Sequence, residues 1–135
     1  MPRVENGSPL KLVESKPNKQ LEVLRRRTDF QEIQKSGRKI RATEWLTICS
    51  RRHKAGYLRY GLTVSRKVGS AVIRNRLKRL SREYFRRAVH EGKGWDNFEV
   101  VIIFRSMPQE YFKRLKLSQL SEFFDKGVER LCRHD

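Results

Sequence analysis

The segment at residues 71–90 constrains the fold more than any other, because it predicts a long helix with two unlike faces. At about 100° per residue, the apolar side chains fall on one stripe of this helix and most of the cations fall on the opposite arc. The stripe holds Ile73, Leu77, Leu80, Tyr84 and Ala88, and the arc holds Arg74, Asn75, Lys78, Arg79, Arg82 and Arg86. A helix of this kind packs its stripe on other elements and exposes the arc to solvent.

Strand patterns lie on both sides of this helix. Residues 40–51 and 57–65 each predict a strand, and in the second one apolar and polar residues alternate. Residues 98–104 are apolar on both faces except at Glu99, which is typical of a strand in the interior of a sheet. Two further helices are expected, at residues 29–36 and 117–132. The order of helix, strands, helix, strand and helix predicts an α+β sandwich, in which helices pack on a small sheet.

The chain has 135 residues, a length that fits one domain, which we assign to residues 21–135. Residues 1–20 hold three of the four prolines and no sustained periodicity, so they predict a flexible tail. Cys49 and Cys132 form no CxxC motif, and the three histidines show no ligand spacing, so no zinc site is expected. No run of residues is apolar enough for a membrane span or a secretory signal, and a cytoplasmic location is therefore predicted.

The cations far outnumber the acids and are concentrated in one segment. Lys and Arg number 32 against 15 Asp and Glu, which gives a formal net charge of +17. Residues 65–90 carry nine of the cations and a single acid, Glu83, for a net charge of +8. Like charges at i and i+4 repel by a few tenths of a kcal/mol per pair, so helix stability does not explain this distribution. It instead predicts a surface for a polyanion, with nucleic acid, anionic lipid and acidic protein as the candidates.

Among these polyanions, structured RNA fits the sequence best. A membrane surface is a weaker candidate, because the apolar stripe opposite the cations is needed against the sheet. Arginine predominates over lysine in the helix, and its planar guanidinium pairs with phosphate and stacks on bases. No helix-turn-helix, zinc finger or basic zipper is apparent, which argues against a reader of duplex DNA. The acids are scattered among basic neighbours, so we expect no catalytic residue and no bound metal ion in this chain for phosphodiester cleavage.

The run SRKVGSAVIRNRLKRLSRE at residues 65–83 closely resembles the arginine-rich signature of the bacterial ribonuclease P protein family. Upstream, LRRRTDF at residues 24–30 and Gly37 resemble that family's opening helix, and residues 98–104 sit where its last strand is expected. The resemblance covers about residues 20–132 and leaves out the first twenty.

The resemblance implies a compact fold like domain 2 of ribosomal protein S5, with a mixed sheet of about four strands and a left-handed β-α-β crossover. It also implies a protein subunit of an endoribonuclease that removes the 5′ leader of precursor tRNA, with the catalytic centre and its Mg²⁺ in the RNA subunit. The implied partners are the ribonuclease P RNA and precursor tRNA, with no membrane and no obligate protein partner. Two alternatives stay open, a structured-RNA or ribosome-binding module without a catalytic partner and a basic membrane-surface protein.

The resemblance also implies two sets of RNA-binding residues. The contacts to the RNA subunit would be Arg66, Lys67, Arg74, Asn75, Arg76, Lys78, Arg79 and Arg82. The precursor-tRNA leader would lie in a cleft between the first helix and the sheet, facing Phe30, Trp45 and Arg59, although both aromatic residues could instead belong to the core. The sequence departs from the family at Gln34, where many members carry an aromatic residue one turn after the Phe30 position. Stacking in the cleft is therefore expected to be weaker or to use another residue.

Overall fold

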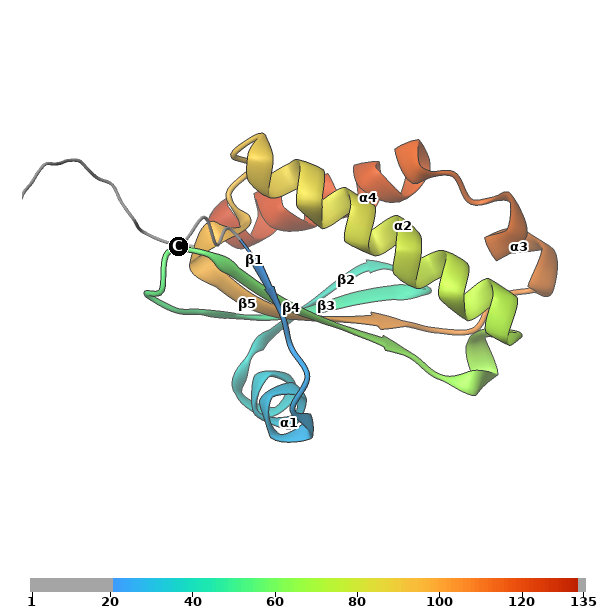
Figure 1. Cartoon of the computed structure of the whole chain (residues 1–135), viewed down its shortest axis with the longest axis horizontal. Coiled ribbons are helices and arrows are strands. Elements are labelled where there is room, and N and C mark those ends of the chain that lie inside the picture. The colour runs from blue at the N-terminus through green and yellow to red at the C-terminus, as the bar shows by residue number, and fades with distance from the viewer. Residues whose placement is uncertain (1–20, 134–135) are drawn as a thin grey trace, which may run out of the picture.

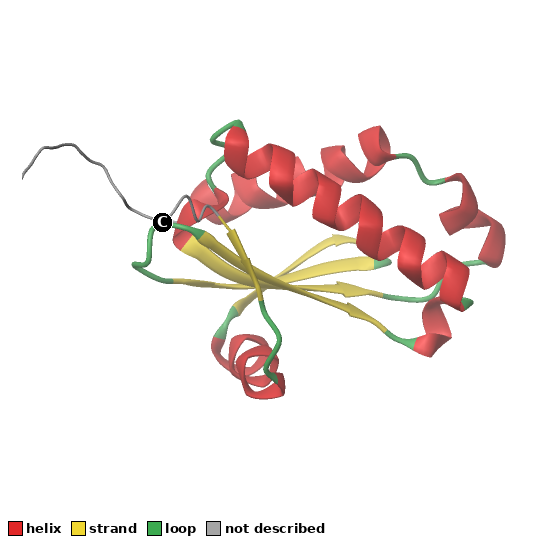
Figure 2. Ribbon diagram, viewed as in Figure 1, coloured by secondary structure: helices red, strands yellow, loops and turns green. Residues whose placement is uncertain are grey.

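A computed structural model describes residues 21–133, which form one mixed five-stranded sheet with helices on both faces (Figures 1 and 2). The strands, in chain order, are β1 (Leu21–Val23), β2 (Arg38–Thr43), β3 (Leu46–Arg52), β4 (Leu58–Val64) and β5 (Phe98–Phe104). Their order in the sheet is β1-β4-β5-β3-β2. Strands β1, β4 and β5 run parallel, whereas β3 is antiparallel to both β5 and β2. The predicted α+β sandwich is thus confirmed.

The helices divide unequally between the two faces of the sheet (Figure 2). Helix α1 (Arg27–Ser36) covers one face and contacts β3 and β5. On the other face lie α2 (Ala71–His90), α3 (Gln109–Arg114) and α4 (Leu117–Arg133). Short 3-10 turns precede α2 at Arg66–Val68 and β5 at Trp95–Asn97. The parallel neighbours β4 and β5 are joined through α2, which makes the expected β-α-β crossover.

Strand β5 is covered on both faces, which explains its nearly continuous apolar sequence. Val100 and Ile102 belong to the larger core under α2 and α4. Val101 belongs to a smaller core with Leu24, Ile33 and Cys49, and Ile103 packs against the edge of that core. Because β5 has β4 on one side and β3 on the other, it is an interior strand, as its sequence predicted.

Helix α2 has the bounds that the sequence predicts. The Ser70 side chain accepts a hydrogen bond from the Ile73 N–H, so Ser70 is the N-cap. All five residues of the predicted stripe are buried, and Phe85, which the sequence places beside the cationic arc, is also fully buried and stacks on Tyr60. The helix therefore packs a wider face on the sheet than periodicity alone indicated.

The prediction of a single strand at residues 40–51 is wrong, because this segment makes the β2–β3 hairpin. The chain turns at Glu44 and Trp45, where the Thr43 hydroxyl accepts the Trp45 N–H at 3.1 Å. Neither glycine nor proline marks this turn, so the sequence held no strong signal for it. Strand β1 and helix α3 were also not expected, and the sheet has five strands rather than about four.

Helix α1 begins at Arg27, two residues before the predicted start, and ends as predicted before Gly37. A Cβ atom at Gly37 would lie 2.3 Å from the Ile33 carbonyl oxygen and 2.7 Å from that of Ser50. Glycine is required here because two backbone segments approach so closely that a side chain has no room.

One sequence prediction, the flexible tail at residues 1–20, lies outside the described residues. Within residues 21–133, none of the helices combines the length and the apolar character that a membrane span requires.

Candidate nucleic-acid interface

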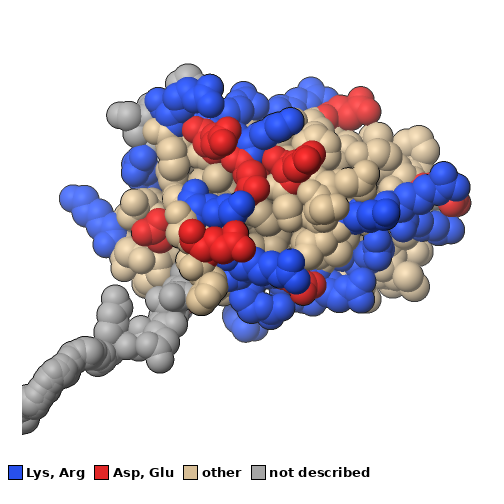
Figure 3. All heavy atoms as spheres, turned by 90° about the horizontal axis from the view of Figure 1, so that it is seen from above, with Lys and Arg blue, Asp and Glu red and all other residues tan. Residues whose placement is uncertain are grey.

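The solvent-facing side of α2 carries a dense set of cations, which we call the cationic surface. Asn75, Arg79, Arg82 and Arg86 are exposed, and Lys78 is half-exposed at its margin. Seen from above the helices (Figure 3), cations lie mainly along the margins of this side of the molecule, with acidic and uncharged side chains between them. In the described part of the chain, no carboxylate forms an ion pair with Arg79, Arg82 or Arg86. The surface is therefore free to receive an external polyanion.

The one acid of α2 does little to neutralise this surface. Glu83 pairs with Arg87 at 3.4 Å, and both side chains lie on the flank of the helix rather than in the middle of the arc. Repulsion between the remaining arginines is thus uncompensated within the helix.

Two arginines of the signature differ from the others, because they bind main-chain carbonyls. Arg74 Nε donates to the Gly69 carbonyl at 3.2 Å, which ties the start of α2 to its lead-in. Arg76 Nε donates to the Phe112 carbonyl at 3.3 Å, and its Nη2 donates to the Leu115 carbonyl. Both side chains are only half-exposed.

The lead-in to α2 extends the cationic surface. Arg66 and Lys67 lie on the 3-10 turn and are exposed. The Ser106 hydroxyl donates to the Lys67 carbonyl at 2.7 Å, so this turn is anchored to the segment after β5. Val72, in the first turn of α2, is 76% exposed, which places an apolar side chain among the cations. All eight residues that were predicted to contact the RNA subunit thus lie on α2 and its lead-in, and the exposed Arg86 and Val72 lie on the same helix.

On the opposite face of the sheet, Phe30 lies directly over β4. A Cβ atom at Gly61 would come within 2.4 Å of Phe30 Cζ and 2.5 Å of Phe30 Cε1, so the ring rests on the strand backbone. The ring is half-buried and packs beside the smaller core. The side of the Phe30 ring that faces β4 is therefore packed against the protein, and only the exposed remainder of the ring can contact a ligand.

Arg59 lies near Phe30 and ties three elements together through carboxylates. Its Nε binds Glu22 of β1 at 3.0 Å, its Nη2 lies 3.5 Å from Asp29 of α1, and its Nη1 binds Glu99 of β5. Glu99 is buried and also accepts a hydrogen bond from Arg51 at 3.0 Å. Burial lowers the pKa of Arg59, but the hydrogen bonds that its guanidinium donates to Glu22 and Glu99 outweigh this effect, so the pKa is raised and the guanidinium stays charged.

Two hollows lie on this side of the sheet, and only the first is lined by Arg59. One of about 640 Å³ is lined by β1, the start of α1 and Arg59. Another, of about 390 Å³, is lined by Lys39, Arg41, Thr47 and Arg105, three of which are cationic. These three cations were not among the residues expected to bind RNA, although the alternation of basic residues at 39 and 41 was available as a signal.

Trp45 does not lie with Phe30 and Arg59, which corrects the expectation that it faces the same cleft. Its side chain is 2% exposed and belongs to the larger core on the opposite face of the sheet. Ring centroids of Phe104, Tyr111, Phe112 and Phe123 lie 5.4 to 6.1 Å from that of Trp45. Gln34 is half-exposed on α1, one turn after Phe30.

Among residues 21–133, no three His, Cys, Asp or Glu side chains come together as metal ligands. His53 Nε2 lies 2.7 Å from the Tyr57 carbonyl oxygen, and His90 is exposed at the end of α2. What the described residues do form is one cationic surface on α2 and one mixed aromatic and charged surface on the α1 face.

Known proteins are similar to this chain in both sequence and fold. The sequence model of a family described as Ribonuclease P matches residues 19–132. The Ribonuclease P protein component of Thermotoga maritima is 39% identical over 94 residues, which cover 70% of this chain and 78% of the relative. That of Edwardsiella ictaluri is 40% identical over 105 residues, covering 77% and 78%.

Solved structures agree with these relatives. The RNase P protein from Thermotoga maritima superposes with a TM-score of 0.70 at 36% identity, over 81% of this chain and 96% of the other. The Staphylococcus aureus RNase P protein superposes with a TM-score of 0.63 at 27% identity, over 82% and 94%.

Proposed function

The chain belongs to the ribonuclease P protein family, and on that premise we propose that it binds the catalytic RNA of ribonuclease P through α2 and the 5′ leader of precursor tRNA through the α1 face. The observation that carries this proposal is the cationic surface, whose exposed arginines have no carboxylate partners among the described residues. The proposed activity is endonucleolytic removal of the leader by the holoenzyme, which gives the mature 5′ end of the tRNA.

The cationic surface suits RNA because guanidinium groups pair with phosphate in a bidentate manner and release counterions on binding. Arg79, Arg82 and Arg86 project from one side of a rigid helix whose other side is buried, so their spacing is preorganised. The exposed Val72 adds an apolar contact for a ribose or a base. Phosphate neutralisation by this surface would lower the cost of bringing two RNA molecules together.

The α1 face suits a single strand, for which proteins combine aromatic side chains with cations that follow the backbone. Phe30 supplies the aromatic contact, and the hollow with Lys39, Arg41 and Arg105 supplies cations on the same face of the sheet. Arg59 borders this region but is held by three carboxylates, so its contribution is to shape the site and offer its exposed edge. Mg²⁺ bound by the RNA subunit would supply the hydrolytic chemistry, and this chain would bind and orient the substrate.

Reconstitution tests the proposal. The purified full chain is added to a bacterial ribonuclease P RNA and precursor tRNA at low Mg²⁺, and release of the 5′ leader is measured. We expect cleavage well above that by RNA alone. Binding to the RNA without stimulation would instead favour a structured-RNA module with no catalytic partner, and no binding would reject the RNA proposal altogether.

Matched variants separate the two proposed surfaces. Arg79→Gln with Arg82→Gln removes two cations from α2, and Lys116→Gln with Lys126→Gln removes two exposed cations outside it. Only the first pair should weaken assembly with the RNA.

Phe30→Leu retains an apolar side chain but loses the aromatic face, so it should weaken binding of precursor tRNA and leave leaderless tRNA unaffected. Equal effects on both tRNAs would contradict the leader assignment.

A further inference from the structure

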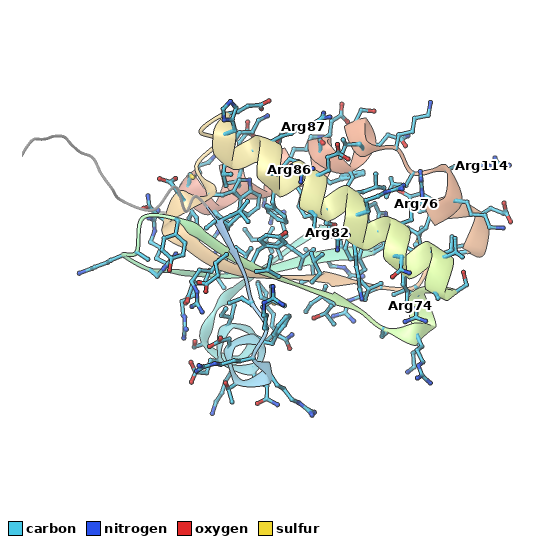
Figure 4. All side chains as sticks on the ribbon, in the orientation of Figure 1. Arg74, Arg76, Arg82, Arg86, Arg87 and Arg114 are labelled. Carbon is cyan, nitrogen blue, oxygen red and sulfur yellow. The ribbon has the colours of Figure 1, made fainter. Side chains whose placement is uncertain are left out.

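Arg76 lies within the arginine-rich signature, yet its side chain extends toward α3 rather than along the exposed arc (Figure 4). Its Nε and Nη2 atoms, which form one edge of the guanidinium, donate to the Phe112 and Leu115 carbonyls. These two acceptors are 36 and 39 residues away in the sequence. Arg76 thus connects the start of α2 to the turn between α3 and α4.

The carbonyls that Arg76 reaches need an external donor. Helix α3 has six residues and ends at Arg114, so the carbonyls around its end lack helical partners. Phe112 and Leu115 are 0% and 3% exposed, which limits access of water to this turn. A cationic donor at the carbonyl end of a helix also interacts favourably with the helix dipole.

The cations that follow Arg76 on α2 have no such role. Arg79, three residues later, is exposed and makes no hydrogen bond or ion pair with the described residues. Arg82 and Arg86 continue the same exposed arc. The signature therefore contains cations in two different environments. Arg74 and Arg76 bind main-chain carbonyls, and of these two only Arg76 reaches another helix, whereas Arg79, Arg82 and Arg86 are exposed.

On the basis of the proposed function, we propose that Arg76 is a positioning residue that fixes the α3–α4 turn against α2, while Arg79, Arg82 and Arg86 contact RNA phosphates. Lysine cannot replace arginine in this role, because a single ammonium group does not reproduce the planar fork that reaches two carbonyls. At a phosphate contact, lysine loses the bidentate pairing but retains the charge, and with it the counterion release that sets the salt dependence. Arg→Lys and Arg→Gln substitutions consequently separate the two roles.

The experiment compares Arg76→Gln and Arg76→Lys with the matched variants Arg79→Gln and Arg79→Lys in the full chain. Three quantities are measured: the Tm of the free protein, amide hydrogen exchange at residues 109–120, and the salt dependence of binding to ribonuclease P RNA. Binding is measured at a temperature where every variant is folded.

Both Arg76 variants should lower the Tm by roughly 5 °C and accelerate exchange in α3 and at the start of α4. Neither Arg79 variant should do so. Arg79→Gln should reduce the slope of log affinity against log salt by roughly 0.7 to 0.9, the value for one phosphate contact. Arg76→Gln should leave that slope unchanged, and Arg79→Lys should preserve it.

A slope for Arg76→Gln as shallow as that for Arg79→Gln would overturn the assignment, whatever its Tm. Unchanged Tm and exchange in Arg76→Lys would overturn it too, since the fork would then not be needed. If the wild-type chain does not bind the RNA, the proposed function fails, and the Tm and exchange measurements still decide whether Arg76 holds the turn.

Discussion

Gly61 has no side chain, and this lets the Phe30 ring of α1 lie directly on strand β4. The Phe30 ring occupies the space that a Cβ atom at this position would need, at 2.4 Å from Cζ. The ring belongs to a helix and the glycine to a strand, so this contact sets how closely α1 approaches the sheet. At the same scale, the Arg59 guanidinium holds Glu22, Asp29 and Glu99 around the same region.

Gly61→Ala should displace the Phe30 ring and destabilise the protein by about 1 to 3 kcal/mol, the usual cost of overpacking. Because the ring also belongs to the proposed leader site, the holoenzyme should lose part of its preference for precursor tRNA over leaderless tRNA. Urea unfolding and competitive tRNA binding measure the two effects.

Gly127→Ala is the matched control on the other face of the sheet. Its Cβ atom would lie 2.5 Å from Ile48 Cδ1, so it also crowds the core, but Ile48 belongs to the larger core, on the face of the sheet opposite α1. This variant should keep its tRNA preference, and its free energy of unfolding is measured beside that of Gly61→Ala. An equal loss of preference in both variants would show that general destabilisation, and not the position of Phe30, is responsible.

At the scale of elements, a hydrogen-bonded group joins α2 to α4 and to the turn before β5. The Tyr84 hydroxyl donates to Asp125 at 2.7 Å and accepts from the Trp95 indole N–H at 3.0 Å. Lys93 binds the other oxygen of Asp125 at 3.0 Å. Burial, followed by the hydrogen bond to Asp125, raises the pKa of Tyr84 well above its ordinary value.

Because the folded-state pKa of Tyr84 is raised, the neutral phenol stabilises the folded protein below the unfolded pKa of about 10. This contribution is lost as the pH rises from about 10 toward the folded pKa. Tyr84→Phe should cost about 1 to 3 kcal/mol at neutral pH, since it removes the partner of Asp125 and of the buried Trp95 N–H. It should also reduce the fall in unfolding free energy above about pH 10.

Unfolding of the wild type and Tyr84→Phe by urea between about pH 8 and 11 measures this effect. Tyr60, whose pKa burial also raises, is present in both proteins, so the difference between them isolates Tyr84. Parallel pH profiles would mean that Tyr84 does not titrate differently in the folded and unfolded protein.

At the scale of the whole molecule, a net charge of +17 on 135 residues destabilises the free protein through repulsion but favours its binding to a polyanion. The uncompensated arginines of α2 repel one another in the free protein and would be neutralised in a complex with RNA. Salt screens both interactions, so it should affect free protein and complex in opposite directions.

Raising the salt from about 50 to 200 mM should increase the Tm of the free protein by a few degrees, because it screens repulsion. The same change should weaken binding to ribonuclease P RNA by about 100- to 1,000-fold if about five phosphates are contacted. Thermal unfolding and filter binding in the same buffers provide the comparison. A Tm that falls with salt would show that attractive ion pairs, such as those of Glu99, outweigh the repulsion.

The sequence by itself determined α2, β4, β5 and the cationic surface, because each depends on the periodicity of neighbouring residues along one element. The order of these elements along the chain then determined the α+β sandwich. It also indicated the family, through a signature that lies on a single helix and its lead-in. Only the tertiary structure decided that residues 40–51 fold into a hairpin, that Trp45 is buried in the core, and that Arg59 and Arg76 are bound to other elements. The physical reason in the case of the hairpin is that its turn contains neither glycine nor proline, so no local signal marked it. The side chains of Trp45, Arg59 and Arg76 meet partners 30 or more residues away, such as Asp29 for Arg59 and Phe112 for Arg76, and no local pattern encodes such contacts.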